Sequence, residues 1–364
     1  MHVRSAGLLA LLVLGTATHL FAGQKWEIEA HGGVLTSTNP SSGTSTLPPI
    51  GPDIPLIGSV PTPITRQVPS WYFGDGAAIL NEILGPRSPI QIAPLDPLLE
   101  SRIVDRQTGG SLGFRVDRGL TRRFAAEFAF DASRGTLAIR PASSKLAAAS
   151  DASFSPVWTT LLSLPTAANQ TVTSETTFND KRGHQLITTG SLLVNLLTGP
   201  GFTPYVAVGA GYIAAGDDAP SVTLVGNYSF TFPTTIIGLP IPPAHINETD
   251  TVKVQVVAKN TVTWVFGGGV KYALGDRWGV RADLRDYVNR DVVRTVVSTA
   301  PASASGPPSG SLTFSFRQTA PLIVFGTSPL ALSTLSTKLT DVQTFKGNGI
   351  VNQINATAGI YWRF

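Results

Sequence analysis

Apolar and polar residues alternate with a period of two in many stretches of this chain. One such stretch places Phe124, Phe128 and Phe130 on one face and Glu127 and Asp131 on the other. Successive side chains of a β-strand point to opposite faces, whereas a helix would scatter these charges around its circumference. The pattern therefore predicts strands with one apolar and one polar face.

Eight segments show this alternation, and the spacing between them is uneven. The predicted strands are 25–34, 109–118, 121–131, 183–196, 202–214, 261–273, 278–287 and 351–364. Three connections have the size and composition of hairpin turns, at 119–120, 198–201 and 274–277. The other four are long, at 35–108, 132–182, 216–260 and 288–350.

This rhythm of short and long connections is typical of a transmembrane β-barrel. The predicted fold is all-β: an eight-stranded antiparallel transmembrane barrel with three short periplasmic turns and four long extracellular loops. A soluble β-sandwich is the alternative, because its strands would also alternate.

Aromatic residues gather at two levels of the apolar faces, as rings do at membrane interfaces. The set near the termini and short turns is Trp26, Phe124, Phe202, Tyr272, Trp278, Trp362 and Phe364. A second set, several residues further along the same faces, is Phe130, Tyr212 and Trp264. Ordinary core packing of the rings is the alternative interpretation.

Charged residues of both signs occupy the opposite faces. The interior of an eight-stranded barrel is only wide enough for side chains, and buried charges must be paired. We therefore expect a closed, ion-paired lumen rather than a transport path. The expected set is Glu27, Glu29, Arg115, Asp117, Arg123, Glu127, Asp131, Lys271, Arg281, Asp283, Arg285 and Arg363, with His31 in it or at its edge.

Composition and the first residues agree with an exported membrane protein. Met1 and Arg4 precede a short apolar run, which predicts a cleaved signal peptide over residues 1–23 and a bacterial outer-membrane location. No later segment has the roughly 20 uninterrupted apolar residues of a spanning helix. The chain has no cysteine and a net charge of +4 without basic clusters, so we expect neither disulfides nor nucleic-acid binding.

The last residues resemble the C-terminal β-signal of outer-membrane barrels. Thr357, Gly359, Trp362 and Phe364 carry the resemblance, with apolar residues alternating along the same final segment. The resemblance implies recognition by the barrel assembly machinery during membrane insertion.

Several segments resemble the OmpA-type and opacity-type outer-membrane β-barrel domains. They are 202–212, 266–272, 278–281 and 285–287. The resemblance covers the strands and turns but not the long loops, and it implies a membrane scaffold whose function varies. The small residues Gly209, Gly211, Gly267 and Gly269 fit a narrow barrel, where they make room for long charged neighbours.

The sequence offers little catalytic chemistry. His31, His184 and His245 cannot be placed with a nucleophile and an orienting group, and we expect no enzyme activity, cofactor or metal site. Asp217 and Asp218 could hold a calcium ion, but no further ligands follow at loop spacing.

Any specificity must therefore lie in the long connections. The first is rich in proline and contains a predicted short helix at 76–84, and the third and fourth carry apolar runs. Such runs mark partner surfaces, fold over the barrel mouth or extend its strands.

The predicted function is that of a non-enzymatic outer-membrane barrel. It displays its loops for envelope integrity, adhesion or surface interaction, with outer-membrane lipid and a surface ligand of the loops as partners. The alternatives are a passive channel for ions or apolar solutes and, third, a barrel enzyme that modifies lipid.

Overall fold

The structure is a computed structural model of the chain. It describes residues 25–47, 50, 68–134, 137–163, 167–197, 201–216, 219–232, 235–236, 239–240, 244–290, 293–300, 312–315, 322–325 and 338–364. The predicted signal peptide and the Asp217–Asp218 pair lie outside these residues.

Eight antiparallel strands close into a barrel in the order β1-β20-β15-β14-β9-β8-β5-β4. Their bounds are β1 Trp26–Ser37, β4 Gly109–Gly119, β5 Phe124–Arg134, β8 His184–Asn195, β9 Phe202–Ala215, β14 Thr261–Ala273, β15 Trp278–Asn289 and β20 Val351–Arg363. The predicted eight-stranded antiparallel barrel and the all-β fold class are confirmed. β1 closes the barrel by pairing with β20 on one side and β4 on the other, so that Glu29 faces both Tyr361 and Arg115.

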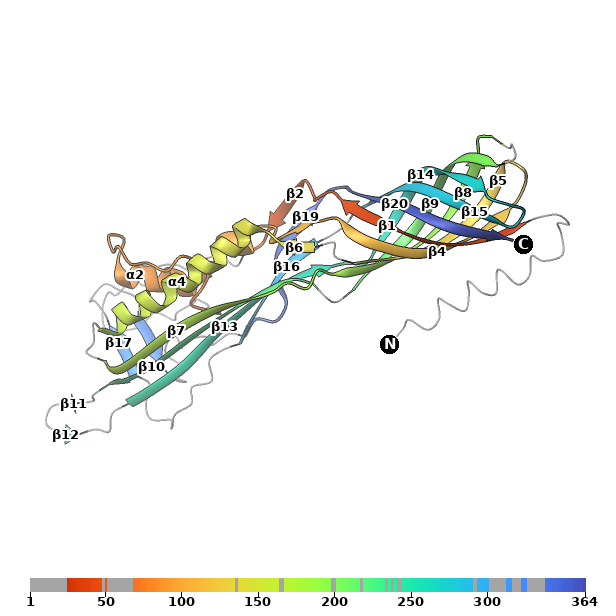
Figure 1. Cartoon of the computed structure of the whole chain (residues 1–364). Coiled ribbons are helices and arrows are strands. Elements are labelled where there is room, and N and C mark those ends of the chain that lie inside the picture. Colours follow the sequence, from red (N-terminus) through yellow and green to blue (C-terminus); the bar gives the residue numbers. More distant parts are fainter. Residues whose placement is uncertain are drawn as a thin grey trace.

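The three short connections lie at one end of the barrel, which we call the turn end, together with the free ends of β1 and β20 (Figure 1). One predicted boundary was wrong here, because β5 begins at Phe124 rather than at position 121. The hydroxyl of Thr121 accepts hydrogen bonds from the backbone N–H groups of Arg123 and Phe124, at 3.2 and 3.0 Å. Such bonds favour a turn over continued strand pairing.

The four long connections carry a second sheet, which we call the extension. Its six strands are ordered β2-β19-β16-β13-β10-β7. Their bounds are β2 Ser42–Ser45, β7 Ala168–Asn179, β10 Ser221–Phe232, β13 Ala244–Ala258, β16 Val293–Ala300 and β19 Val342–Asn348. This is the order of the barrel strands β1, β20, β15, β14, β9 and β8 to which they connect, so the extension prolongs most of the barrel wall (Figure 1).

The two remaining barrel strands are prolonged by a separate strand pair. β4 and β5 connect to β3 Val104–Arg106 and β6 Leu137–Ile139, which pair only with each other. Above β4 and β5 the wall is continued by this pair, where the Arg106 N–H donates to Asn39 Oδ1 at 2.8 Å and the Leu137 N–H donates to the Arg182 carbonyl oxygen at 3.1 Å. The short pairs β11 Thr235–Ile236 with β12 Leu239–Pro240, and β17 Leu312–Ser315 with β18 Leu322–Phe325, complete the described strands.

In the described part of the chain, three helices pack on the inner face of the extension. They are α2 Gly74–Leu84, α3 Asp96–Leu99 and α4 Pro141–Ser163. A fully buried aromatic stack joins α4 to the sheet: Trp158 lies 4.5 Å from Tyr228 and 5.3 Å from Trp71, measured between ring centroids. The predicted helix at 76–84 is confirmed within α2, whereas α4 was not predicted. None of the helices in the described part of the chain has the length and apolarity needed to cross a bilayer.

The polar and apolar faces of the strands change sides where the barrel meets the extension. In β13, Val252, Val254 and Val256 are buried against the helices, and Lys253 faces out. In β14, which follows directly, Lys271 faces in and Trp264 and Phe266 face out, with 61% and 50% of their surfaces exposed. The barrel thus has an apolar outer wall, whereas the extension has an apolar core.

Candidate functional site: the barrel lumen

The alternation of the barrel strands carries charged side chains into the lumen, where they are almost completely buried. Arg115, Arg281 and Arg285 expose 1–2% of their surfaces. Inward glycines make this possible. A Cβ atom added at Gly269 would lie 2.5 Å from the Tyr205 hydroxyl oxygen, and one at Gly113 would lie 2.6 Å from His31 Nε2.

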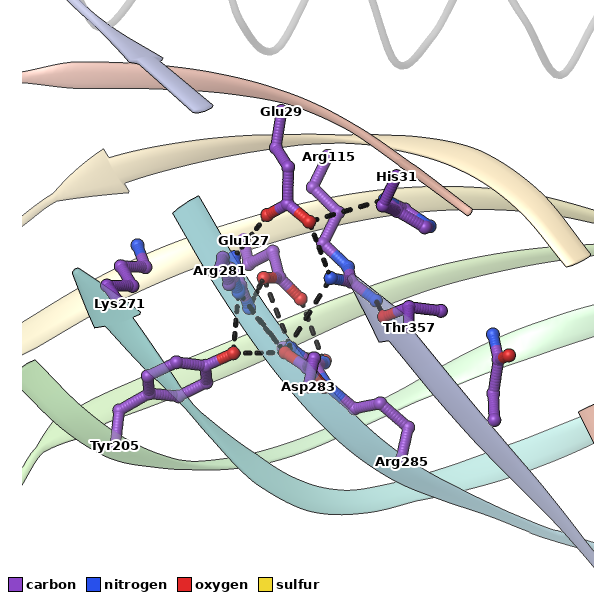
Figure 2. Close-up of polar contacts among 12 residues, drawn as sticks. Glu29, His31, Arg115, Glu127, Tyr205, Lys271, Arg281, Asp283, Arg285 and Thr357 are labelled. Carbon is purple, nitrogen blue, oxygen red and sulfur yellow. Dashed lines mark hydrogen bonds and ion pairs between the residues drawn. The ribbon is translucent and has the colours of Figure 1, made fainter. Parts of the chain in front are cut away.

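The centre of the lumen is a cluster of two arginines and two carboxylates (Figure 2). The Nη2 atom of Arg281 lies 2.6 Å from Glu127 Oε2 and 2.8 Å from Asp283 Oδ2. Arg285 binds the same two carboxylates, with Nε 2.7 Å from Asp283 Oδ1 and Nη1 2.8 Å from Glu127 Oε1. Each carboxylate therefore bridges two guanidinium groups, the arrangement that makes buried charge tolerable.

Glu29 and Arg115 extend this cluster to β1 and β4, which lie between β5 and β20 in the barrel. Arg115 Nη1 lies 2.9 Å from Glu29 Oε1, and Arg281 Nη1 lies 3.0 Å from Glu29 Oε2. The Nη2 group of Arg115 also donates to Thr357 Oγ1, at 3.0 Å (Figure 2). The network thus ties β1, β4, β5, β15 and β20 across the interior.

A further layer lies towards the turn end. Lys271 Nζ lies 2.5 Å from Glu27 Oε2 and 2.6 Å from Asp117 Oδ2. Arg363, which is partly exposed, donates to Glu27 Oε1 from Nε at 2.8 Å. Lys271 therefore links the buried part of the network to its rim.

Towards the extension the network ends on Asp131. This carboxylate lies 2.8 Å from His31 Nε2, and it accepts hydrogen bonds from Asn355 Nδ2 at 3.2 Å and the Tyr287 hydroxyl at 3.3 Å. His31 and Asp131 are buried completely at the side chain. His31 therefore lies at the edge of the network that faces the extension, one of the two positions predicted for it.

An apolar layer follows the network towards the extension. It consists of the fully or nearly fully buried residues Leu35, Ile187, Ile213, Val265 and Tyr287. Beyond it, Gln185 Nε2 donates to Gln353 Oε1 at 2.7 Å, beside a cavity of about 20 Å³. That volume is close to the space one water molecule needs.

Most of the predicted lumen residues meet in this network, with one exception. Arg123 is exposed in the turn before β5, because β5 begins one residue later than Arg123. Tyr205 was not predicted to take part, although it has the inward parity of Ala207 and Gly209; its hydroxyl donates to Asp283 and accepts from Arg281 Nε. Thr357 was assigned only to the assembly signal.

The predicted interface aromatics lie on the outer wall. Phe124, Phe202, Tyr212, Trp264, Tyr272 and Trp278 are 42–61% exposed. Trp26 and Phe130 are half-buried there, because Arg118 lies over the Trp26 ring at 5.2 Å and Phe114 stacks on Phe130 at 5.5 Å.

The residues of the predicted assembly signal divide between the two faces of β20. Trp362 stacks on Trp278 at 6.0 Å and lies 5.4 Å from Phe364, measured between ring centroids on the outer face. Gly359 faces inward, where an added Cβ would lie 2.7 Å from Glu29 Oε1. Recognition by the assembly machinery stays a prediction.

A separate buried carboxylate ties the helical layer to the extension sheet. Asp250 Oδ2 in β13 accepts hydrogen bonds from Ser70 Oγ at 2.8 Å and from the Trp71 backbone N–H at 2.7 Å. Burial in the apolar core raises the pKa of Asp250 to about 7, and the nearby Glu248 carboxylate adds to the rise, against the two hydrogen bonds.

The fold and the lumen define a closed eight-stranded antiparallel barrel with a folded extension.

No protein-family model matches the chain, and no curated protein matches it. Two solved structures are similar over most of their length. The outer membrane protein OprG from Pseudomonas aeruginosa has a TM-score of 0.38 and 11% identity, covering 93% of this chain and 95% of that one. The outer membrane protease OmpT from Escherichia coli has a TM-score of 0.25 and 8% identity, covering 96% and 99%. Both TM-scores are below 0.5, so the barrel assignment rests on the strand pairing itself.

Proposed function

We propose that this chain is a non-enzymatic outer-membrane barrel with a closed lumen, which holds a rigid extension outside the cell for envelope integrity, adhesion or surface interaction. The observation that supports a closed lumen is that two layers of side chains, one charged and one apolar, fill it in succession. The charged network is followed along the barrel axis by the apolar layer of Leu35, Ile187, Ile213 and Val265. An ion entering this path would have to break buried ion pairs and then cross an apolar constriction.

The membrane position is supported by the outer wall. Bulky apolar side chains are exposed around the barrel between the two aromatic levels, among them Phe128, Val208, Leu284 and Ile360. A soluble protein would bury such a band, whereas a bilayer covers it. The resemblance to OmpA-type and opacity-type domains agrees with this proposal.

The extension supports a display role. Its helices and sheet share a core that includes Trp71, Phe154, Trp158 and Tyr228, each at most 1% exposed. A segment with its own core holds a fixed surface, unlike a flexible loop. We expect the partner of the protein to be a ligand that binds the surface of the extension.

Planar-bilayer recordings test the closed lumen. We expect no stable openings for the wild type, and openings for Ile187→Gly/Ile213→Gly combined with Arg281→Ser, which removes apolar bulk and a central cation. Reproducible single-channel conductance of the wild type would favour the passive channel instead.

The enzyme alternative has one feature to consider, the His31–Asp131 pair. It lies inside the lumen with no exposed side-chain surface, and the nearby Ser111 hydroxyl is bonded to Asn355. We therefore propose a structural role for it. Mass spectra of lipid A with and without expression of the protein test this, since any new lipid A species would support the enzyme.

A further inference from the structure

Two basic side chains lie opposite each other where the extension leaves the barrel. Arg294 in β16 and Lys346 in β19 are direct partners in the strand register. Val293 and Thr295, the chain neighbours of Arg294, are buried on the inner face, so Arg294 and its partner Lys346 belong to the outer face. The same row continues with Val257 in β13 and Thr44 in β2, which carry no charge.

This pair lacks the counter-charge that would stabilise it. Like charges directly opposite each other destabilise an antiparallel pair. Neither side chain forms an ion pair within the described part of the chain, and the Arg294 Nε atom is buried there without a hydrogen-bond acceptor. The nearest carboxylates along β13, Glu248 and Asp250, are buried on the inner face.

The position of the Arg294–Lys346 pair along the membrane normal can be judged from the aromatic residues on the outer face of the barrel. Trp264, in the level furthest from the turn end, is paired with Val288. Arg294 is paired with Val257 in β13, and Trp264 follows Val257 by seven residues. Seven residues span at most about 24 Å, or roughly 17 Å along the membrane normal at a tilt near 45°. Arg290 is exposed and follows Val288 by two residues, at the edge of the apolar wall, and Arg294 and Lys346 lie within the level of lipid headgroups beyond it.

We propose that Arg290, Arg294 and Lys346 bind the phosphate groups of the phosphorylated glycolipid of the outer leaflet. Arginine forks bind phosphate oxygens in pairs, and lysine adds a point charge. A bound phosphate relieves the repulsion between Arg294 and Lys346. The site rests on the proposed membrane position, and it gives the rigid extension a lipid anchor at its base.

The experiment uses the full chain in phosphatidylcholine nanodiscs, titrated with bisphosphorylated lipid A and read by native mass spectrometry. The test variant is Arg294→Gln/Lys346→Gln. The matched control, Arg122→Gln/Arg123→Gln, removes the same charge from exposed positions at the turn end. We expect lipid A binding to weaken about tenfold or more in the test variant and to stay unchanged in the control.

Two further arms identify the source of the phosphate. Lipid A stripped of its phosphates should bind no better to the wild type than to the test variant, and millimolar inorganic phosphate should not displace lipid A. Equal loss in both variants, equal binding of the stripped lipid, or displacement by inorganic phosphate would overturn the proposal. Heat-modifiable migration and conductance, measured on the same samples, report separately on the barrel and its closed lumen.

Discussion

Arg281 is the side chain on which the lumen network converges. It is 2% exposed and lies within 3.2 Å of oxygens on Glu29, Asp117, Glu127 and Asp283. Arg281→Met should destabilise the barrel by about 3–5 kcal/mol, because the carboxylates stay buried without their cation. Denaturant unfolding in lipid vesicles, followed by tryptophan fluorescence, measures the change.

The matched control for this prediction is Arg123→Met, since Arg123 is exposed in the turn and outside the network. It should change stability by less than about 0.5 kcal/mol. Equal losses from the two variants would mean that buried ion pairing is not what holds the barrel wall together.

Asp250 gives the extension a dependence on pH. Its pKa is about 7 in the folded protein and near the ordinary 3.8 when unfolded. Between these values the folded state holds a proton that the unfolded state lacks, so the stability of the extension falls as pH rises from about 4 to 7. The loss is on the order of 4 kcal/mol at most.

Asp250→Asn tests this argument, because the amide keeps an oxygen that can accept from Ser70 and Trp71 but cannot ionise. Hydrogen exchange of the amides in α2, measured from pH 5 to 8 and corrected for intrinsic exchange, should show falling protection with pH in the wild type and a flatter profile in the variant. A wild-type profile that rises with pH would contradict the assigned protonation.

At the scale of elements, α4 secures the helical layer through one aromatic side chain. Trp158 is completely buried between Trp71 and Tyr228. Trp158→Ala should cost the extension about 3–5 kcal/mol through the cavity it leaves. Limited proteolysis should then cut residues 68–103 and 141–163 faster, with barrel migration on gels unchanged.

Lys145→Ala is the control on the same helix, because Lys145 is exposed. It should leave the cleavage rates as they are in the wild type. If α4 is cleaved at the same rate in both variants, the aromatic stack does not hold the helix against the sheet.

The barrel strands were predictable because their two environments differ so strongly. Charged residues such as Glu127 and bulky rings such as Phe128 cannot exchange faces, so each register is fixed by the sequence. The extension strands also alternate, as in Val252, Lys253 and Val254, but with the polar face outward and few charges. Without a partner layer to identify, this alternation was compatible with several arrangements.

The helix α4 was missed for a different reason. Its first half is rich in alanine and serine, and the apolar positions Phe154, Trp158 and Leu161 appear only in its second half. A long apolar stripe, the usual signal of a packed helix, is therefore absent. Within the site, Tyr205 and Thr357 were missed because a neutral side chain on the inner face does not indicate from sequence which residue it will hydrogen-bond. Arg123 was assigned to the lumen because the turn before β5, which the Thr121 hydroxyl stabilises, was read as strand.

At the scale of the whole molecule, the barrel and the extension are held by different forces. The barrel interior is mainly ionic and hydrogen-bonded, and its outer wall is apolar; the extension has a single apolar core in which Asp250 and Glu248 are buried. The polarity inversion near Ala258 separates the two, because among the described residues the apolar core of the extension and the apolar layer of the barrel are separate clusters. Their stabilities should therefore respond to different conditions.

Mild denaturant or sodium dodecyl sulfate at room temperature should unfold the extension first and leave the barrel closed. The physical reason is that detergent competes for apolar cores, whereas the barrel wall already faces lipid and its strands are hydrogen-bonded in a ring. Proteolysis with mass spectrometry should then find protected peptides from β4 with β5, β8 with β9, and β14 with β15, and cleaved peptides from β10, β13 and α4. Simultaneous loss of protection in both sets would show that the extension and the barrel fold as one cooperative unit, with the extension strands holding the barrel wall in place.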